Sequence, residues 1–123
     1  MKLHLNQSVN THYFTGYGEG YVEVNRQRHE RSLVVMPDRL WTDWSGTTFE
    51  ALAAADLEAL AALGQEVILL GTGNLLRFPR PELMRPLIQA RIGLEVMDVT
   101  AACRTYNILM SEGRKVAAAL LLD

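Results

Sequence analysis

The hydrophobic and polar positions of the first 45 residues predict β-strands. Residues 12–25, HYFTGYGEGYVEVN, alternate large side chains with turn residues. This alternation predicts a β-hairpin, in which Gly16, Gly18 and Gly20 are expected to supply the positive φ angles that a tight reversal or a bulge would need. Residues 31–37, RSLVVMP, form a short β-branched run that ends at a proline, which cannot donate to a sheet ladder. RLWTDW at residues 39–44 predicts a further extended piece.

A helical pattern begins near residue 49. The segment 49–64, FEALAAADLEALAALG, is rich in strong helix formers, and Gly64 lies where a left-handed cap would follow the helix. Two starting points fit this pattern, one at residue 49 and one at about residue 53. The later start would place Asp56 near the positive N-terminal end of the helix.

Two further helices are predicted in the second half of the chain. Residues 81–93 place Pro81 at the first helical position, where its missing N–H does no harm. Pro86 lies inside this helix and is expected to kink its axis. Residues 100–113 form the last helical pattern, with Gly113 past its end.

Short apolar runs between the helices predict buried strands at residues 66–70, 94–99 and 115–122. Because strands and helices alternate here, we expect parallel pairing with right-handed crossovers, at least between 66–70 and 94–98. The sequence therefore predicts an α/β fold with a mixed sheet. The whole chain, residues 1–123, has the length of one domain.

Charge and composition argue against several classes of partner. The chain carries 12 Lys and Arg residues and 14 Asp and Glu residues, and its one basic cluster, Arg26 to Arg31, is interrupted by Glu30. No nucleic-acid partner is therefore expected. No apolar run approaches the roughly 18 residues of a spanning helix, so stable membrane insertion is not expected. The N-terminus lacks the apolar core of a signal peptide, and the expected location is cytoplasmic.

The residue types that carry metal or nucleophilic chemistry are sparse. Cys103 is the only cysteine, which excludes an internal disulfide and a multi-cysteine metal site within one chain. It lies near a predicted helix N-terminus, where a thiol can be a nucleophile, but no His is near it in sequence and a buried structural thiol is favoured. The three His residues lack metal-binding spacing. No metal site and no catalytic residue are predicted, and Trp41 and Trp44 are interpreted as packing residues.

The carboxyl ends of the two predicted parallel strands indicate a candidate site. Ligands of open α/β sheets bind just beyond such ends, and here residues 71–73 and 98–100 would emerge at the same edge. Thr100 is interpreted as the N-cap of the last helix, whose free N–H groups would point into this edge. Arg104 lies one turn further along. A Gly-flanked loop, a helix N-terminus and an arginine together suit a carboxylate or a phosphate.

Structural interpretations of the same residues remain open. The two glycines of residues 71–73 are also typical of a sharp turn, and Thr100 of a cap without a ligand. On a helix that starts at Thr100, one narrow polar stripe carries Thr100, Arg104, Asn107 and Ser111. In sequence, a stripe that lines a cleft and a stripe that meets bulk water look alike.

Known phosphate-binding motifs do not match this edge. GTGNLL at residues 71–76 has Leu76 where the dinucleotide fingerprint needs its third glycine, and the Gly-Lys-Ser/Thr ending of the nucleotide P-loop is absent. No cofactor is therefore predicted. Glu112 and Arg114 flank Gly113, and the preferred interpretation is an ion pair across the turn. The alternative is that either side chain turns into the cleft.

Two of these stretches carry a resemblance to a known family. LLGTG at residues 69–73 and EVMDVTAACRTYNILMSEGRKVAAALL at residues 95–121 are similar to the small domain of mitochondrial respiratory complex I assembly factor three and of the adipogenesis-associated domain protein. Single-domain members of this family of unknown function resemble the chain over nearly its full length, including FTGYGEGYVEVNRQRHERSLVVMP at residues 14–37. The resemblance implies a three-layer fold with a mixed central sheet of about five strands, and no established enzymatic activity.

The family motif coincides with the candidate site. It falls on Gly71, Thr72, Gly73, Asp98, Thr100, Ala102, Thr105, Asn107, Glu112, Gly113 and Arg114. Family members commonly carry a threonine where this chain has Val99, which leaves any hydroxyl role to Thr100. The candidate ligand-binding residues are therefore Gly71, Thr72, Gly73, Asp98, Thr100, Arg104, Thr105, Asn107, Glu112 and Arg114.

Two functions are consistent with these features. The leading hypothesis is a non-enzymatic interaction or assembly factor with protein partners, and the resemblance implies a relation to respiratory complex I. The alternative is a small-molecule binding protein or weak enzyme that takes an anionic ligand at the cleft between Gly71–Gly73 and Thr100. A binder requires a concave pocket at that edge, with Arg104 pointing into it, whereas an assembly factor requires an exposed apolar patch.

Overall fold

Two sheets and three helices make up residues 11–42, 44 and 48–122, the part of the chain that the computed structural model describes. The N-terminal sheet is antiparallel and consists of β1 (Phe14–Gly18), β2 (Tyr21–Val24) and β3 (Gln27–His29). The central sheet has the order β5-β4-β8-β6-β7 and consists of β4 (Leu33–Val35), β5 (Leu40–Trp41), β6 (Val67–Thr72), β7 (Gly93–Met97) and β8 (Val116–Leu121). The helices are α2 (Ala54–Ala61), α3 (Pro81–Gln89) and α4 (Val99–Ser111).

The central sheet is mixed, as predicted. β6 pairs in parallel with both β7 and β8, and Leu70 lies opposite Val96 on one side and Ala119 on the other. β4 pairs antiparallel with β8 and with β5. The expected parallel pairing of residues 66–70 with 94–98 is therefore confirmed.

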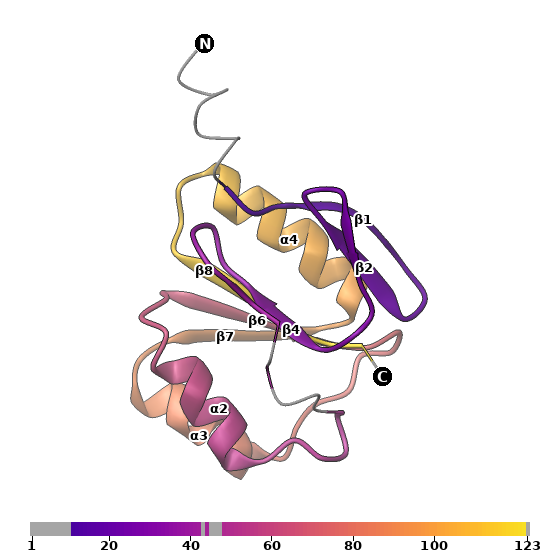
Figure 1. The fold of residues 1–123 in the computed structure, drawn as a ribbon. Helices are drawn as coiled ribbons and strands as arrows, with labels where there is room; N and C mark the ends of the chain where they lie inside the picture. Colours follow the sequence, from indigo (N-terminus) through magenta and orange to yellow (C-terminus); the bar gives the residue numbers. More distant parts are fainter. Residues whose placement is uncertain (1–10, 43, 45–47, 123) are drawn as a thin grey trace.

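β8 lies in the middle of the central sheet, with both of its faces buried. Its alternate residues divide between two cores, Val116, Ala118 and Leu120 on one face and Ala117, Ala119 and Leu121 on the other. In Figure 1, α4 and the N-terminal sheet cover one face, while α2 and α3 cover the other. The three-layer α/β fold with a five-stranded mixed sheet is thus confirmed.

The N-terminal sheet is larger than the predicted hairpin. A third strand, β3, adds to β2, because Asn25 and Arg26 adopt positive φ angles of 48° and 70° and reverse the chain a second time. Of the three glycines expected to have positive φ, Gly20 does, at 77°, whereas Gly16 and Gly18 lie within β1. The expectation of a positive φ angle at Gly16 and Gly18 is therefore wrong, although the register of β1 against β2 does shift between Phe14 and Gly16, as at a bulge.

The helix boundaries decide between the predicted alternatives. α2 follows the later start, with Ala53 as its N-cap, and the Ala53 N–H donates to the Asp56 carboxylate at 2.9 Å. α3 has Pro81 at its first position and continues past Pro86 to Gln89. In the described part of the chain, no helix is long and apolar enough to cross a bilayer.

The two tryptophans pack as expected. Trp44 is buried in the core between the central sheet and the α2/α3 layer, and Trp41 is half-buried on β5 at the edge of the sheet. β5 covers only part of the extended piece predicted at 39–44, and residue 43 lies outside the described residues.

Candidate functional site

Gly71 of β6 lies directly beneath the first turn of α4. A Cβ atom built on Gly71 would come within 2.8 Å of Leu120 Cδ2, 3.3 Å of Ala102 Cβ and 3.3 Å of the Val99 Cα atom. A contact of 2.8 Å is closer than Cβ atoms come to other heavy atoms and the two contacts of 3.3 Å are tight, so a side chain at this position would force its neighbours to shift. The absence of a side chain at Gly71 therefore serves helix–sheet packing.

Two N–H groups in the first turn of α4 are bonded by the Asp98 side chain and by the Gly73 carbonyl. α4 begins at Val99 and its N-cap is Asp98, whose carboxylate accepts a hydrogen bond from the Ala101 N–H at 2.9 Å. The Val99 N–H donates to the Gly73 carbonyl at 2.9 Å. The interpretation of Thr100 as the cap is wrong, because Asp98, two positions earlier, has the extended backbone and the acceptor that a cap needs.

The cavity at this edge is small. Residues 71–73 and 98–100 do emerge side by side, as expected. The space near them has a volume of only about 10 Å³ and is lined by Gly18, Gly20, Gly73, Asn74, Val99 and Leu122. A volume of this size holds about one water molecule. Small-molecule sites usually enclose several hundred Å³, so this space is too small for such a ligand.

The polar stripe of α4 contacts the N-terminal sheet of the same chain. Asn107 bonds the backbone of Phe14 twice, accepting from its N–H at 2.9 Å and donating to its carbonyl at 2.8 Å. Arg104 Nε donates to the Tyr17 hydroxyl at 2.9 Å, and the Tyr106 hydroxyl donates to the His12 carbonyl at 3.0 Å. Arg104 thus points toward β1 and does not enter a cleft beside Gly71, while Thr100 and Ser111 at the ends of the stripe are exposed.

The remaining predicted residues are spread along α4. Thr105 is half-buried near the middle of the helix. Glu112 and Arg114 lie past its C-terminal end, about 20 Å from its first residue at 1.5 Å per residue. Arg114 forms its ion pair with Glu66, at 3.5 Å, and the prediction that it pairs with Glu112 is therefore wrong. The structure therefore brings 71–73 and Asp98 together and leaves Glu112 and Arg114 at the other end of the sheet.

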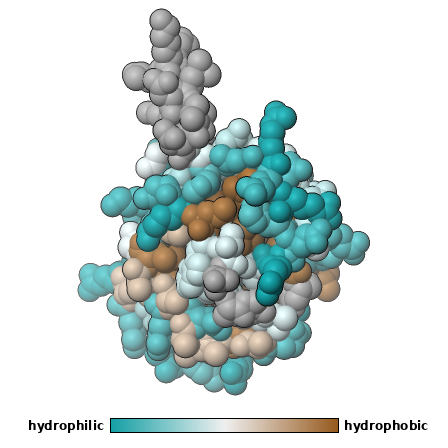
Figure 2. Space-filling model, viewed as in Figure 1, coloured by the Kyte–Doolittle hydropathy of each residue, from teal (hydrophilic) through white to brown (hydrophobic). Residues whose placement is uncertain are grey.

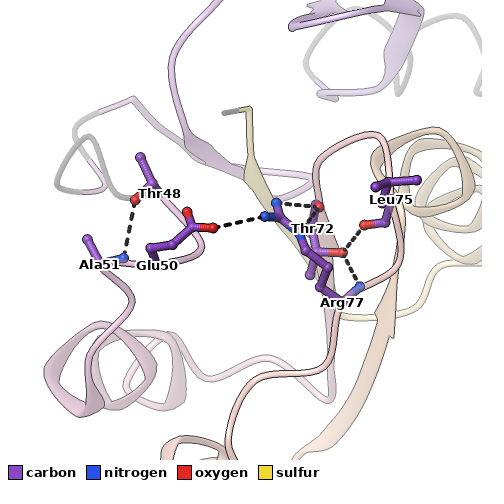
Figure 3. A network of polar contacts seen from close by, with 6 residues as sticks. All are labelled: Thr48, Glu50, Ala51, Thr72, Leu75 and Arg77. Carbon is purple, nitrogen blue, oxygen red and sulfur yellow. Dashed lines mark hydrogen bonds and ion pairs between the residues drawn. The ribbon is translucent and has the colours of Figure 1, made fainter.

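Thr72 and Arg77 organise the loop that follows β6 (Figure 3). The buried Thr72 hydroxyl donates to the Leu75 carbonyl at 2.7 Å and accepts from the Arg77 N–H at 3.0 Å. The Arg77 guanidinium returns to the Thr72 carbonyl, with Nη2 at 2.9 Å, and forms an ion pair with Glu50 at 3.4 Å. Sequence reasoning missed Arg77, because no motif or periodicity connects it with a strand that ended five residues earlier.

This loop, residues 73–79, presents large apolar side chains to solvent, and we refer to it as the apolar loop. Leu75 is 71% exposed, Leu76 52% and Phe78 66%. Figure 2 shows hydrophobic surface at the right-hand edge of the molecule, where the chain leaves β6 in Figure 1. In the sequence, the run NLLRFP at residues 74–79 carries this signal, since its three large apolar residues follow no helix or strand period.

Cys103 is the buried structural thiol that was favoured over a nucleophile. Its side chain lies in the core under α4 with no exposed surface. Burial, and secondarily the Asp98 carboxylate, raise the pKa of the Cys103 thiol to about 12. A thiolate is the reactive form, so this thiol is inert at neutral pH. Within the described residues, no group of three His, Cys, Asp or Glu residues could hold a metal ion.

We expect the protein to lose stability as the pH rises from about 9 to about 12. In that window the unfolded chain releases the Cys103 proton while the folded chain retains it, so deprotonation favours unfolding. Burial also raises the pKa of the Tyr106 phenol, which acts in the same direction. Urea unfolding at several alkaline pH values should show a falling midpoint, with a shallower fall in Cys103→Ala. Equal slopes for the two proteins would contradict this assignment.

The fold and sequence match known proteins. The sequence pattern of a family described as "Protein of unknown function (DUF498/DUF598)" matches residues 14–121. An uncharacterised protein of Rhodobacter capsulatus is 36% identical over 107 residues, which are 86% of this chain and 81% of that protein. The crystal structure of a protein from Bordetella parapertussis has a TM-score of 0.85 and 41% identity, and the match covers 92% of this chain and 97% of that one.

Two mammalian relatives whose names state a role are longer than this chain. NADH dehydrogenase (ubiquinone) 1 alpha subcomplex assembly factor 3 of Bos taurus is 39% identical over 111 residues, which are 89% of this chain and 60% of the bovine protein. The match to the mouse protein of the same name covers 46% of this chain and 30% of that protein. This chain therefore spans less than two thirds of either mammalian protein. The family pattern and the Rhodobacter relative each cover most of the chain, which belongs to the DUF498/DUF598 family of proteins of unknown function.

Proposed function

We propose that this protein is a non-enzymatic interaction or assembly factor, located in the cytoplasm, that binds a protein partner through the apolar loop. The observation that supports this most is the exposure of Leu75, Leu76 and Phe78 on one short segment. Full burial of a Leu or Phe side chain stabilises by about 1.5–3 kcal/mol relative to leaving it in water. Three such side chains in close succession are typical of an interaction surface.

The order of the apolar loop also suits a binding role. Hydrogen bonds of Thr72 to Leu75 and Arg77 hold the first part of the loop, and the Arg77 guanidinium packs over the Phe49 ring with 4.5 Å between its central carbon and the ring centroid. A loop that is already ordered loses little conformational entropy on binding. Its apolar side chains can therefore contribute most of their burial free energy to the complex.

The related proteins support the same role. The bovine and mouse relatives are, by name, assembly factors of an NADH dehydrogenase subcomplex. Participation of this chain in the assembly of respiratory complex I is part of the proposal. The alternative, an anionic ligand between Gly71–Gly73 and the start of α4, has less support, since the space there is about 10 Å³ and the Val99 and Ala101 N–H groups are already bonded.

Affinity capture with two matched variants tests the proposed role. The tagged protein, incubated with an extract of the cells that produce it, should retain respiratory or other membrane-complex subunits at stoichiometric levels. The double variant Leu75→Asp/Phe78→Asp should retain at least about ten-fold less of these subunits, because apolar contacts that the complex buries are replaced by buried charges. Ile108→Asp, which changes an exposed apolar side chain on α4, should capture the subunits normally.

Two outcomes would overturn the proposal. One is that the wild-type protein retains no such subunit above the level of an unrelated tagged protein. The other is that the double variant captures as much as the wild type. The melting temperatures of all three proteins should agree, since Leu75, Phe78 and Ile108 are exposed and contribute little to the core.

A further inference from the structure

A large groove lies at the opposite end of the central sheet from the apolar loop. Its volume is about 890 Å³, and three connections frame it: the β4–β5 turn, the α2–β6 turn and the α4–β8 turn. β6 begins at this end and leads to the apolar loop at the other end (Figure 1). The groove is therefore separate from the edge at residues 71–73 and from the apolar loop.

Three cationic residues line this groove. Arg39 comes from the β4–β5 turn, and Arg114 and Lys115 come from the α4–β8 turn. Asp38 also lines the groove and lies 3.8 Å from Arg39, and Glu66 lies 3.5 Å from Arg114, so three positive charges meet two negative charges and leave a local excess of one. The whole chain has a net charge of −2, and this local excess is therefore opposite in sign to the protein as a whole.

The cations are held in position by the fold. Arg39 Nη2 donates to the Leu63 carbonyl at 2.9 Å, which ties the β4–β5 turn to the end of α2. Arg114 lies 3.5 Å from Glu66. The Lys115 carbonyl accepts from the N–H groups of Glu66 and Val67 at 2.9 and 3.2 Å, which places Lys115 at the start of β8. Within the described residues its ammonium group has no bonded carboxylate and remains available to an anion.

The wall of the groove also offers apolar surface. Tyr13, Pro37, Leu63 and Met110 line it and are each half-buried. A ligand that fits both features carries negative charges and apolar groups on one body. A bare inorganic anion would leave this apolar surface in water.

The weakness of each single charge contact indicates that a ligand of this groove has to make several of them at once. The side chains of Arg39 and Arg114 are 51% and 46% exposed. An ion pair at such exposure changes affinity by no more than about five-fold, so one small anion would bind weakly. A peptide with several carboxylates spaced by apolar residues contacts all the cations and the apolar wall together, and these contributions multiply.

We propose that this groove binds an acidic, partly apolar peptide segment of a partner protein. The groove and the apolar loop lie at different ends of the sheet. Binding at the groove is therefore independent of binding at the apolar loop, and each can be tested separately. Electrostatic attraction between the cations and the segment makes the binding dependent on salt.

A pair of matched peptides tests the proposal. The probe is a fluorescein-labelled peptide of sequence Gly-Glu-Leu-Glu-Glu-Leu-Glu-Gly, and the control peptide has Gln at every Glu. Fluorescence anisotropy with the full chain should show binding of the Glu peptide and at least about ten-fold weaker binding of the Gln peptide. In amide NMR spectra, the shifts caused by the Glu peptide should cluster at residues 63–65 and 113–115.

Variants distinguish this site from general charge attraction. Arg114→Gln/Lys115→Gln should weaken Glu-peptide binding about ten-fold, as two exposed ion pairs multiply, whereas Arg85→Gln removes an exposed charge from α3 and should leave it unchanged. The variant Leu75→Asp/Phe78→Asp should also bind normally, which separates this test from that of the apolar loop. Citrate serves as a small polyanion for comparison. The proposal would be overturned if the Gln peptide or citrate bound as tightly as the Glu peptide, or if the amide shifts caused by the Glu peptide lay away from residues 63–65 and 113–115.

Discussion

Gly71→Ala is expected to lower the free energy of unfolding by about 1–3 kcal/mol, the usual result of overfilling a packed core. The added methyl group would lie 2.8 Å from Leu120 Cδ2 and 3.3 Å from the Val99 Cα atom. Leu120 is fully buried, which restricts where its Cδ2 can turn, and the Val99 backbone can move aside only together with the start of α4. Urea unfolding followed by circular dichroism measures the change.

The matched control for this substitution is Gly93→Ala. Gly93 lies on the neighbouring strand β7, and a Cβ atom there would be 3.5 Å from the Glu66 carbonyl oxygen, an ordinary contact. Gly93→Ala should therefore leave stability within about 0.5 kcal/mol of the wild type or raise it slightly. If Gly71→Ala were as stable as Gly93→Ala, the packing role of Gly71 would be wrong. A ligand role would then regain support.

Asn107→Ala is expected to lower the free energy of unfolding by about 2–3 kcal/mol, because it leaves two backbone groups of β1 without partners. The Asn107 amide accepts from the Phe14 N–H and donates to the Phe14 carbonyl. These two backbone groups therefore bond Asn107 in place of a second neighbouring strand on the edge of β1. Urea unfolding measures the loss of stability. Hydrogen exchange at the Phe14 amide should accelerate at least about ten-fold if the N-terminal sheet opens locally.

Ser111→Ala is the control on the same helix. The exposed Ser111 hydroxyl bonds the Ile108 carbonyl within α4, so its removal should change stability by less than about 0.5 kcal/mol. If Asn107→Ala left both stability and Phe14 exchange at their wild-type values, the polar stripe would not anchor the N-terminal sheet. The ligand interpretation of that stripe would then need to be considered again.

Much of the fold could be predicted because its information is local. The Ala- and Leu-rich pattern around α2, the apolar run of β6 and the Pro81 start of α3 each reflect short-range preferences of the backbone. The alternation of strands and helices then limits the topology to parallel crossovers. The boundaries were less secure, and α4 begins at Val99 because Asp98 competes successfully with Thr100 as the cap.

The candidate site was harder to predict because its partners are remote in sequence. Arg104 and Asn107 bond residues 87 and 93 positions away, on an N-terminal sheet whose docking site no local pattern reveals. Arg114 pairs with Glu66 and not with its neighbour Glu112, since the α2–β6 turn approaches the end of α4 only in the folded chain. Arg77 likewise acquires its role from the path of a loop.

Four features could be predicted from the sequence alone: the α/β class, the parallel pairing of β6 with β7, the meeting of residues 71–73 with 98–100 at one edge, and the burial of Cys103. These features follow from hydrophobic periodicity and chain connectivity, which act over short distances. Only the tertiary structure decided that the polar stripe of α4 anchors the N-terminal sheet, that the apolar loop is exposed and that three cations share a groove. Each depends on where separate segments pack, and packing is decided by the whole chain.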